Sequence, residues 1–387
     1  MAGRILVLNT GSSSIKYELV DVDTHERPAR GLIERIGEET GRITHQAGDA
    51  PPYVRERPFP GHGEGLDAMM EAFAAAGPDM APVAVGHRVV HGGTRFTEAV
   101  LVDDEVIAAI EELSPLAPLH NPVNVTGIRV ARTAFPGVPQ VAVFDTAFHR
   151  TLPPEAYTYA VPQGWGVRRF GFHGTSCAYV SRRAAAHLGR DLTELNLIVL
   201  HLGNGASATA INGGHSVDTS MGMTPLEGLV MGTRSGDVDP ALAGYLARVK
   251  ELDAQQVEHA LTHCGGLLAL TGTRDMREVR GRHDDEARLA LEIYTRRIRK
   301  YVGAYYALLG RVDTIVFTGG VGENDAATRA ASLAGLERLG IAVDPALNQA
   351  HTTGERAVSP QGAEVPVLVI PTDEEWEIAR QARALIS

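Results

Sequence analysis

The sequence predicts an α/β protein with more than one domain. Short apolar runs rich in β-branched residues alternate with amphipathic stretches of helical length, and three of these runs end in glycine-rich polar segments. The chain has 387 residues, which corresponds to two or three domains at about 150 residues each. Its composition, 44% hydrophobic and 21% charged, is that of a globular protein and not of a disordered or fibrous one.

Strands are expected where the three apolar runs lie, each followed by a polar loop. The expected pairs of strand and loop are Ile5–Leu8 with Asn9–Ser14, Leu197–Leu200 with His201–Ser207, and Ile315–Phe317 with Thr318–Asn324. The spacing of apolar residues, with Asp, Thr or Ser at several starts, predicts five main helices. These helices are expected at Glu64–Ala76, Asp104–Leu113, Thr175–Leu188, Pro240–Lys250 and Asp285–Leu309.

A polar loop followed at once by returning strands occurs twice. Alternating apolar and polar residues predict an antiparallel meander over 15–46, after the first loop, and a hairpin over 206–219, after the second. This recurrence indicates two duplicated halves. The boundary between them is expected near Asp145–Pro154, where two consecutive prolines interrupt regular structure, and a cleft between the halves would be the natural ligand site.

Charge and cysteine content narrow the class of partner and the compartment. Lys and Arg total 36 against 47 Asp and Glu, and the formal net charge of −11 opposes attraction to nucleic acids or anionic membranes. Two cysteines are too few for a disulfide framework, which suits a reducing compartment. Neither a signal peptide nor an apolar segment of the roughly 18 to 20 residues that span a bilayer is found, so we expect a cytoplasmic protein.

The three glycine-rich segments indicate a nucleotide held at several points. Small residues let backbone N–H groups approach phosphate oxygens, and Lys16 adds positive charge after the first segment. Each segment taken alone is equally an ordinary turn, and Asn9–Lys16 alone is more often a plain hairpin. None matches a Walker A loop or the dinucleotide fingerprint, which disfavours a hydride-transfer enzyme.

Four side chains have the chemistry expected beside a phosphoryl group. Arg88 and Arg234 carry planar donor forks suited to carboxylate and phosphoryl oxygens, although a surface ion pair is the commoner fate of an arginine. Asp145 directly follows an expected strand, where a helix cap is an equal alternative. His173 precedes an expected helix, where it is either a phosphate contact or a buried structural histidine.

Taken in order, the motifs resemble those of the acetate kinase family, within the superfamily of acetate and sugar kinases, Hsc70 and actin. The resemblance runs from end to end of the chain. The matching segments are Asn9–Lys16, Gly86–Gly93, His120–Pro122, Phe144–His149, Gly171–Ser176, His201–Ser207, Thr224–Gly228, Met231–Asp237, Gly319–Asn324 and Thr372–Glu375.

This resemblance implies a fold, a reaction and partners. It implies two duplicated actin-like domains with βββαβαβα cores, placed at 1–148 with 374–387 and at 149–373, around an active-site cleft between the domains. It implies a homodimer that transfers the γ-phosphoryl group reversibly from ATP to acetate, giving ADP and acetyl phosphate. Mg²⁺ is the implied cofactor, with Mn²⁺ as an alternative, and neither nucleic acid nor a membrane is an expected partner.

The family's functional residues carry over onto matching positions of this chain. Catalytic roles fall on Arg88, Asp145, His173 and Arg234. The metal positions are Asn9 and Glu374, with Glu375 left open as the alternative to Glu374. The nucleotide positions are Ser12, Lys16, His201, Leu202, Gly203, Asn204, Gly205, Asp275, Met276, Arg277, Gly320, Val321, Gly322, Glu323 and Asn324. The acid pocket falls on Arg88, Val90, Leu119, Phe172 and Pro225.

Physical chemistry agrees with these roles. A phosphoryl group in transfer spreads negative charge over its oxygens, so arginines, an imidazole and Mg²⁺ are the expected stabilisers. Acetate is already ionised at pH 7, so we expect Asp145 to position Mg²⁺, a water or an arginine and not to remove a proton. Direct in-line transfer is preferred to a phosphoenzyme, for which Glu374 would be the alternative acceptor.

Val90 is the position most informative about the size of the acid. Acetate kinases resemble this chain in having valine there, whereas the related propionate kinases tend to carry a smaller residue. One methylene changes transition-state binding by only about 1 to 3 kcal/mol, so propionate is expected to be a slow substrate. The alternatives are a propionate or butyrate kinase, a polyphosphate-type hydrolase, and a non-metabolic actin-like nucleotide switch.

Two positions depart from the family's pattern. Cys177 stands where histidine is expected, and a buried inert thiol is the favoured interpretation over a thiol near the active cleft. Asp373 stands where asparagine is expected, either adding negative charge near the metal or capping the last helix.

Overall fold

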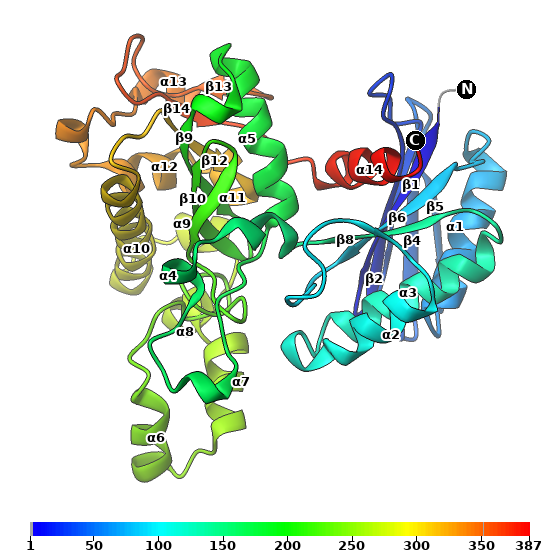
Figure 1. Ribbon diagram of the computed structural model, residues 1–387, viewed down its shortest axis with the longest axis horizontal. Coiled ribbons are helices and arrows are strands. Elements are labelled where there is room, and N and C mark those ends of the chain that lie inside the picture. The colour runs from blue at the N-terminus through cyan, green and yellow to red at the C-terminus, as the bar shows by residue number, and fades with distance from the viewer. Residues whose placement is uncertain (1–2, 351) are drawn as a thin grey trace. The chain divides into compact units, whose positions relative to one another are not determined.

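The computed structural model describes residues 3–350 and 352–387. It consists of two compact units, one holding the chain up to Phe148 together with Asp373–Ser387 and the other holding His149–Thr372. Each unit is built on one mixed sheet with helices packed against it, which confirms the predicted α/β class (Figure 1). No helix in the described part of the chain is both long and apolar enough to cross a bilayer.

The first unit has an eight-stranded sheet in the order β5-β4-β3-β2-β1-β6-β8-β7. Strands β1 to β5 form the predicted antiparallel meander, and β6 and β8 lie parallel to β1. The strands are β1 (Arg4–Gly11), β2 (Ser14–Asp21), β3 (Ala29–Glu34), β4 (Gly41–Ala47), β5 (Tyr53–Arg57), β6 (Ala84–Val89), β7 (Val100–Leu101) and β8 (Gln140–Phe144).

Helices cover both faces of this sheet because successive strand residues point to opposite sides. Leu6 and Leu8 of β1 pack with α1 (His62–Ala76) and α3 (Asn121–Ala134), and α2 (Asp104–Glu112) lies beside α3. Ile5 and Val7 point the other way, onto the C-terminal helix α14 (Glu374–Leu385). The end of the chain therefore completes the core of the first unit, as Figure 1 shows for the red helix beside β1.

The second unit has a six-stranded sheet in the order β11-β10-β9-β12-β14-β13. Its strands are β9 (Asn196–Leu202), β10 (Ala206–Asn212), β11 (His215–Thr219), β12 (Thr314–Thr318), β13 (Arg356–Ala357) and β14 (Val367–Val369). Its helices are α4 (Pro154–Tyr157), α5 (Gly174–Leu188), α6 (Leu242–Lys250), α7 (Ala254–His263), α8 (Gly266–Thr271), α9 (Met276–Gly281), α10 (Asp285–Leu309), α11 (Gly319–Asn324), α12 (Ala326–Leu333) and α13 (Pro345–Gln349).

The two sheets repeat one connectivity, which confirms the predicted duplication. In each unit three consecutive antiparallel strands are followed by two strands that join the sheet parallel to the first of the three. The set β1, β2, β3, β6, β8 of the first unit corresponds to β9, β10, β11, β12, β14 of the second. The carboxyl ends of β1 and β9 therefore occupy equivalent positions in their own units.

All three predicted loops are shorter than expected or absent. Asn9–Gly11 belong to strand β1 and Ser14 begins β2, which leaves only Ser12 and Ser13 as a turn. His201 and Leu202 belong to strand β9, which leaves only Gly203–Gly205 as a loop before β10. The segment predicted as a loop over Thr318–Asn324 is wrong, because Gly319–Asn324 forms helix α11. Gly319 has φ of +76° and its backbone lies against that of Leu202, a conformation and an approach that favour glycine.

A carboxylate within the helix explains why α11 forms despite its glycine-rich sequence. Glu323 accepts a hydrogen bond from the N–H of Gly319 at 3.0 Å and so satisfies one donor of the first turn. At the other end, Arg329 and Arg356 donate to the carbonyl of Glu323. The glycine content of this segment predicts a turn, whereas these polar contacts stabilise a helix.

Gly31→Ala is expected to lower stability through overpacking. The ring of Tyr17 crosses the neighbouring strand at Gly31, where a Cβ atom would lie 2.2 Å from the Tyr17 hydroxyl oxygen. We expect a loss of about 1 to 3 kcal/mol, measured as a lower thermal or urea midpoint. The matched control is Gly63→Ala in α1, where a Cβ meets no atom within 4 Å and stability should stay equal or rise. Equal midpoints for Gly31→Ala and the wild type would contradict the packing argument.

Candidate active site

Arg88 and Asp145 form a paired site at adjacent strand ends of the first unit. Arg88 lies in β6 and donates from Nε and Nη2 to both Asp145 carboxylate oxygens, at 3.1 and 2.6 Å. Its Nη1 lies 3.4 Å from Oδ1 of Asn9 in β1. The bidentate geometry fixes the plane of the guanidinium group. Burial lowers the pKa of Arg88, but the carboxylates of Asp145 and Glu374 more than offset this, so the arginine stays charged.

Glu374 and Glu375 begin helix α14 and differ in their surroundings. Glu375 forms an ion pair with Lys16, with 2.6 Å between Oε1 and Nζ. Burial, followed by the charges of Asp145 and Glu375, raises the pKa of Glu374 to about 7, although Arg88 and Lys16 act in the opposite direction. Glu374 is thus the carboxylate with an excess of negative charge around it.

Asp373 fixes the start of this helix. Its carboxylate accepts a hydrogen bond from the N–H of Trp376 at 3.1 Å, as an N-cap does, and also pairs with Arg27. The departure from asparagine at this position therefore brings a charge whose partner, Arg27, lies in the same unit.

The oxygen atoms around Arg88 fit a hard divalent cation. The amide oxygen of Asn9 and the carboxylates of Asp145 and Glu374 are the ligand types that Mg²⁺ takes, and the raised pKa of Glu374 marks a negative charge that a cation would stabilise. Among residues 3–350 and 352–387, no cluster of three or more His, Cys, Asp or Glu side chains is arranged to hold a metal.

In the second unit, two histidines stack against each other beside the loop after β9. The rings of His173 and His201 have centroids 4.1 Å apart and an interplanar angle of 24°. His173 is the N-cap residue of α5 and has φ of +58°, an uncommon conformation for a residue other than glycine. Its Nδ1 lies 3.0 Å from Ser207 Oγ, so the strained backbone presents a ring that is held in place.

Arg234 approaches the same point from another loop. A Cβ atom built on Gly205 would lie 3.3 Å from both Arg234 Nη1 and His173 Nε2. Arg234 donates to the Pro225 carbonyl at 3.4 Å, and within the described chain it has no carboxylate in ion-pair distance. Burial lowers its pKa. A partly buried guanidinium group without a counter-charge attracts an anion.

The loop that carries Arg234 is closed at its base. Gly228 N–H donates to Asp237 Oδ1 at 2.8 Å and Asp237 N–H donates to the Gly228 carbonyl at 3.0 Å. From α10, Tyr301 donates to Asp237 Oδ2 at 2.9 Å and Arg297 donates to the Gly228 carbonyl at 2.8 Å. These contacts hold both ends of the loop 228–237 at one place.

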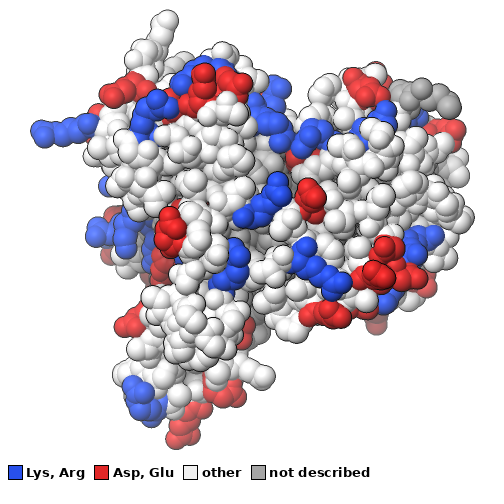
Figure 2. Space-filling model, viewed as in Figure 1, with Lys and Arg blue, Asp and Glu red and all other residues white. Residues whose placement is uncertain are grey.

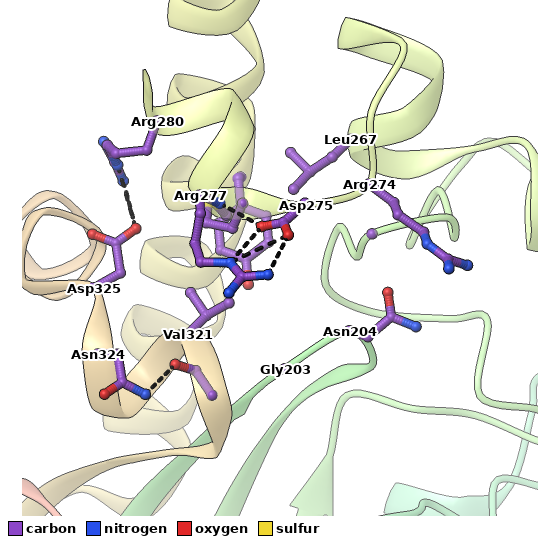
Figure 3. A pocket seen from close by; sticks show the side chains of 14 residues that line it. Gly203, Asn204, Leu267, Arg274, Asp275, Arg277, Arg280, Val321, Asn324 and Asp325 are labelled. Atoms are coloured by element: carbon purple, nitrogen blue, oxygen red, sulfur yellow. Dashed lines mark hydrogen bonds and ion pairs between the residues drawn. The ribbon is translucent and has the colours of Figure 1, made fainter. Parts of the chain in front are cut away.

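A cavity of about 730 Å³ opens next to the loop after β9 (Figure 3). Arg274 and Asn204 lie on one side of it, and Val321 and Asn324 lie on another. Its lining residues are Gly203, Asn204, Gly232, Leu267, Arg274, Asp275, Met276, Arg277, Arg280, Tyr294, Gly320, Val321, Asn324 and Asp325. Apolar walls with polar groups at the ends suit a purine nucleoside.

The nucleotide positions implied by the sequence divide into two groups. Those that line this cavity are Gly203, Asn204, Asp275, Met276, Arg277, Gly320, Val321 and Asn324. The cavity is not lined by Ser12, Lys16, His201, Leu202, Gly205, Gly322 or Glu323. Among these, Ser12 lies in the exposed turn between β1 and β2, and the Glu323 carboxylate is engaged inside α11.

The implied acid-pocket positions also divide between the units, with Arg88, Val90 and Leu119 in the first and Phe172 and Pro225 in the second. In the first unit Val90 is buried, with its N–H bound to Asn124, while Leu119 is 57% exposed. In the second unit Phe172 is buried and the carbonyl of Pro225 accepts the bond from Arg234.

Sequence reasoning did not find Gly232, Leu267, Arg274, Arg280, Tyr294 and Asp325 in the cavity. Gly232 had a signal, because it lies inside the Met231–Asp237 motif, where its Cβ would meet Asn204 Oδ1 at 2.5 Å. Leu267, Arg280 and Tyr294 come from helices whose sequences show only ordinary amphipathic character, and Arg274 and Asp325 lie in short connections before helices. Cys177, in α5, is fully buried, as expected for a structural thiol.

Fold and site together define a nucleotide-dependent phosphotransferase of the duplicated actin-like class. The sequence model of the Acetokinase family matches residues 4–380, and the chain belongs to this family. It is 56% identical to the acetate kinase of Clavibacter michiganensis subsp. michiganensis over 98% of both chains. The crystal structure of Porphyromonas gingivalis acetate kinase superposes with a TM-score of 0.93 at 41% identity, over 100% of both chains. A propionate kinase from Francisella tularensis gives 0.93 at 38% identity, over 99% of both.

Gly205→Ala is expected to impair turnover without unfolding the protein. The new methyl group would lie 3.3 Å from Arg234 and His173 and push one of them away by a few tenths of an ångström. Small misplacements of charge-stabilising groups cost large factors, so we expect kcat to fall about 10- to 100-fold. The control is Gly303→Ala in α10, where a Cβ meets nothing within 4 Å. Wild-type kcat in Gly205→Ala, measured on protein with an unchanged melting temperature, would contradict this geometry.

Proposed function

We propose that this protein transfers the γ-phosphoryl group of ATP reversibly to acetate. The observation that carries the proposal is the partly buried Arg234 guanidinium group beside His173, with no carboxylate paired to it in the described chain. Such a cationic pocket suits the equatorial oxygens of a phosphoryl group in transfer. Membership in the acetokinase family and the similarity to named acetate kinases support the choice of reaction.

The acceptor in this proposal is a carboxylate, and Arg88 binds it. Acetate is ionised at neutral pH, so one of its oxygens forms the new bond to phosphorus while the bond to the β–γ bridging oxygen breaks and ADP leaves. No proton is removed, and Asp145 has no role as a base. Its two hydrogen bonds to Arg88 instead fix the orientation in which the guanidinium group receives the acid.

Mg²⁺ in this proposal neutralises phosphate charge, with Asn9 and Glu374 as the residues that hold it. Glu374 is chosen over Glu375 because Glu375 is paired with Lys16, whereas Glu374 is surrounded by the greater negative charge. The transfer is direct, from ATP to the acid. The nucleoside occupies the cavity lined by Met276 and Val321, which places its phosphates toward Gly203 and Asn204.

A propionate kinase is the second candidate, because the propionate kinase of Francisella tularensis matches with the same TM-score as the acetate kinase structure. Val90 separates the two candidates. Its buried side chain reduces the space for a longer acid, which favours acetate.

The location, domains and assembly belong to the same proposal. The reaction takes place in the cytoplasm, where ATP is available, in a chain whose two cysteines form no disulfide bond. The domains are 1–148 with 374–387 and 149–373. The active form is a homodimer, and the exposed apolar side chains of Val238, Tyr245 and Val249 on and before α6 are its candidate contact surface. On the face shown in Figure 2, acidic and basic side chains are interspersed, which gives no continuous basic surface there for a nucleic acid.

Acyl phosphate formation with Mg-ATP tests the reaction and the acid together. Trapping with hydroxylamine is compared for acetate, propionate and butyrate, and kcat/KM is expected to be highest for acetate. Val90→Ala should raise the ratio for propionate over acetate about 5- to 150-fold, the range expected for one methylene. Arg88→Ala and Arg234→Ala should each lose activity by at least about 100-fold.

Other outcomes of this assay would favour other functions. Activity only with longer acids would replace acetate as the substrate. ATP hydrolysis without any acyl phosphate would favour a hydrolase or a nucleotide switch.

Glu374→Gln is expected to weaken the dependence on Mg²⁺ more than Glu375→Gln. Removing the Glu374 charge should raise the Mg²⁺ concentration for half-maximal velocity about 10-fold or more, because the cation loses a charged oxygen ligand. Glu375→Gln serves as the matched neighbour, since its carboxylate is paired with Lys16. Titration of activity with Mg²⁺ at fixed ATP measures both variants. The assignment is wrong if the larger change occurs in Glu375→Gln.

A further inference from the structure

We infer that Thr372 and Ser176 are positioning residues that set the tautomer of His201. This inference rests on the proposed function, in which the phosphates of the nucleotide lie toward Gly203 and Asn204, in the loop that follows His201. The three side chains form one hydrogen-bonded chain inside the second unit. Thr372 Oγ1 donates to Ser176 Oγ at 2.7 Å, and Ser176 Oγ lies 2.9 Å from His201 Nδ1.

The direction of the first hydrogen bond decides the direction of the second. A serine hydroxyl has one proton to donate, and the Ser176 oxygen already accepts from Thr372. Ser176 therefore gives its proton to the remaining contact, the Nδ1 atom of His201. An Nδ1 atom that accepts a hydrogen bond in a neutral imidazole leaves the ring proton on Nε2.

The Nε2 atom is the useful end of the ring. A Cβ atom on Gly203 would lie 4.0 Å from His201 Nε2, so this nitrogen faces the loop that follows β9 and borders the cavity. An Nε2–H group is a donor and suits an anionic phosphate oxygen, whereas the other tautomer would present a lone pair to the same oxygen. The hydroxyl relay thus selects the form of His201 that binds phosphate.

Each member of the relay is itself held. Ser176 is fully buried in the first turn of α5, the helix for which His173 is the N-cap residue. The N–H of Thr372 donates to Glu323 Oε1 at 3.2 Å, and the same oxygen accepts from Gly319. Thr372 is therefore fixed through its backbone as well as its hydroxyl group. This gives the Glu323 carboxylate a role that the nucleotide assignment had not provided.

The test is the protonation pattern of the His201 ring, observed directly. Enzyme with ¹⁵N-labelled histidine distinguishes protonated from unprotonated ring nitrogens by their ¹⁵N shifts, and a His201→Asn variant assigns the signals. We expect the Nε2–H tautomer in the wild type. Ser176→Ala and Thr372→Val should populate the Nδ1–H tautomer, whereas Thr372→Ser, which keeps the hydroxyl group, should match the wild type.

Two buried hydroxyl groups outside the relay provide matched controls. Ser181→Ala lies in the same helix as Ser176 and removes only a bond to the Ala178 carbonyl. Thr295→Val removes a bond to the Leu291 carbonyl in α10. Both controls should leave the His201 signals unchanged. The inference is overturned if the wild-type ring carries its proton on Nδ1, or if Ser176→Ala does not alter the tautomer.

Kinetics separate this inference from the proposed function. Loss of an orienting partner costs about 10- to 100-fold, so kcat for acyl phosphate formation should fall by that factor in Ser176→Ala and recover in Thr372→Ser relative to Thr372→Val. If the ¹⁵N signals change as expected while kcat does not, the relay holds and the placement of His201 at the phosphates is wrong. If no acid yields an acyl phosphate, the proposed reaction fails and the ¹⁵N signals still decide the relay.

Discussion

The second unit is organised around a partly buried positive charge that has no protein counter-charge in the described chain. Arg234 donates to a carbonyl and to no carboxylate in that part of the chain, and His173 lies across Gly205 from it. Contacts elsewhere in the loop offset the energetic cost of this arrangement. The main ones close the base of the loop and involve Asp237, Gly228, Tyr301 and Arg297. An anionic ligand can therefore form the ion pair that Arg234 lacks within the described chain.

The first unit has the opposite distribution of charge. Its positive group, Arg88, is paired twice with Asp145 and stays charged, and the excess charge is the negative one around Glu374. The second unit thus offers a positively charged group that can bind an anion. The first unit offers oxygen ligands that can bind a cation, beside an oriented arginine. A magnesium–nucleotide complex and a small carboxylate carry the complementary charges.

Much of this was predictable from local sequence, and the exceptions have physical causes. The long helix Asp285–Leu309 was predicted with its observed bounds, because its apolar spacing and its Asp284 cap are local signals. The strand ends that carry Asp145 and His201 were likewise found from β-branched runs. Helix α11 was missed, since glycine content indicates a turn while the hydrogen bonds that Arg356 and Thr372 donate to Glu323 come from distant parts of the chain. The same limit hid Arg274 and Tyr294, whose place in the cavity is decided by packing.

Two segments connect the units. Each contains, within a few residues, a side chain next to the proposed site and a side chain that anchors the segment. One runs from Asp145 to His149, whose Nε2 donates to the carbonyl of Phe172 at 2.8 Å, directly before His173. The other runs from Thr372, bound to Ser176, to Asp373, which caps the helix that begins with Glu374. Each connection therefore has one end bonded to the segment that holds the histidine pair and the other end beside a carboxylate of the first unit. Substitutions in these connections are expected to alter histidine orientation and carboxylate placement together, because the hydroxyl group of Thr372 bonds to Ser176 and the carboxylate of Asp373 caps the helix that begins with Glu374.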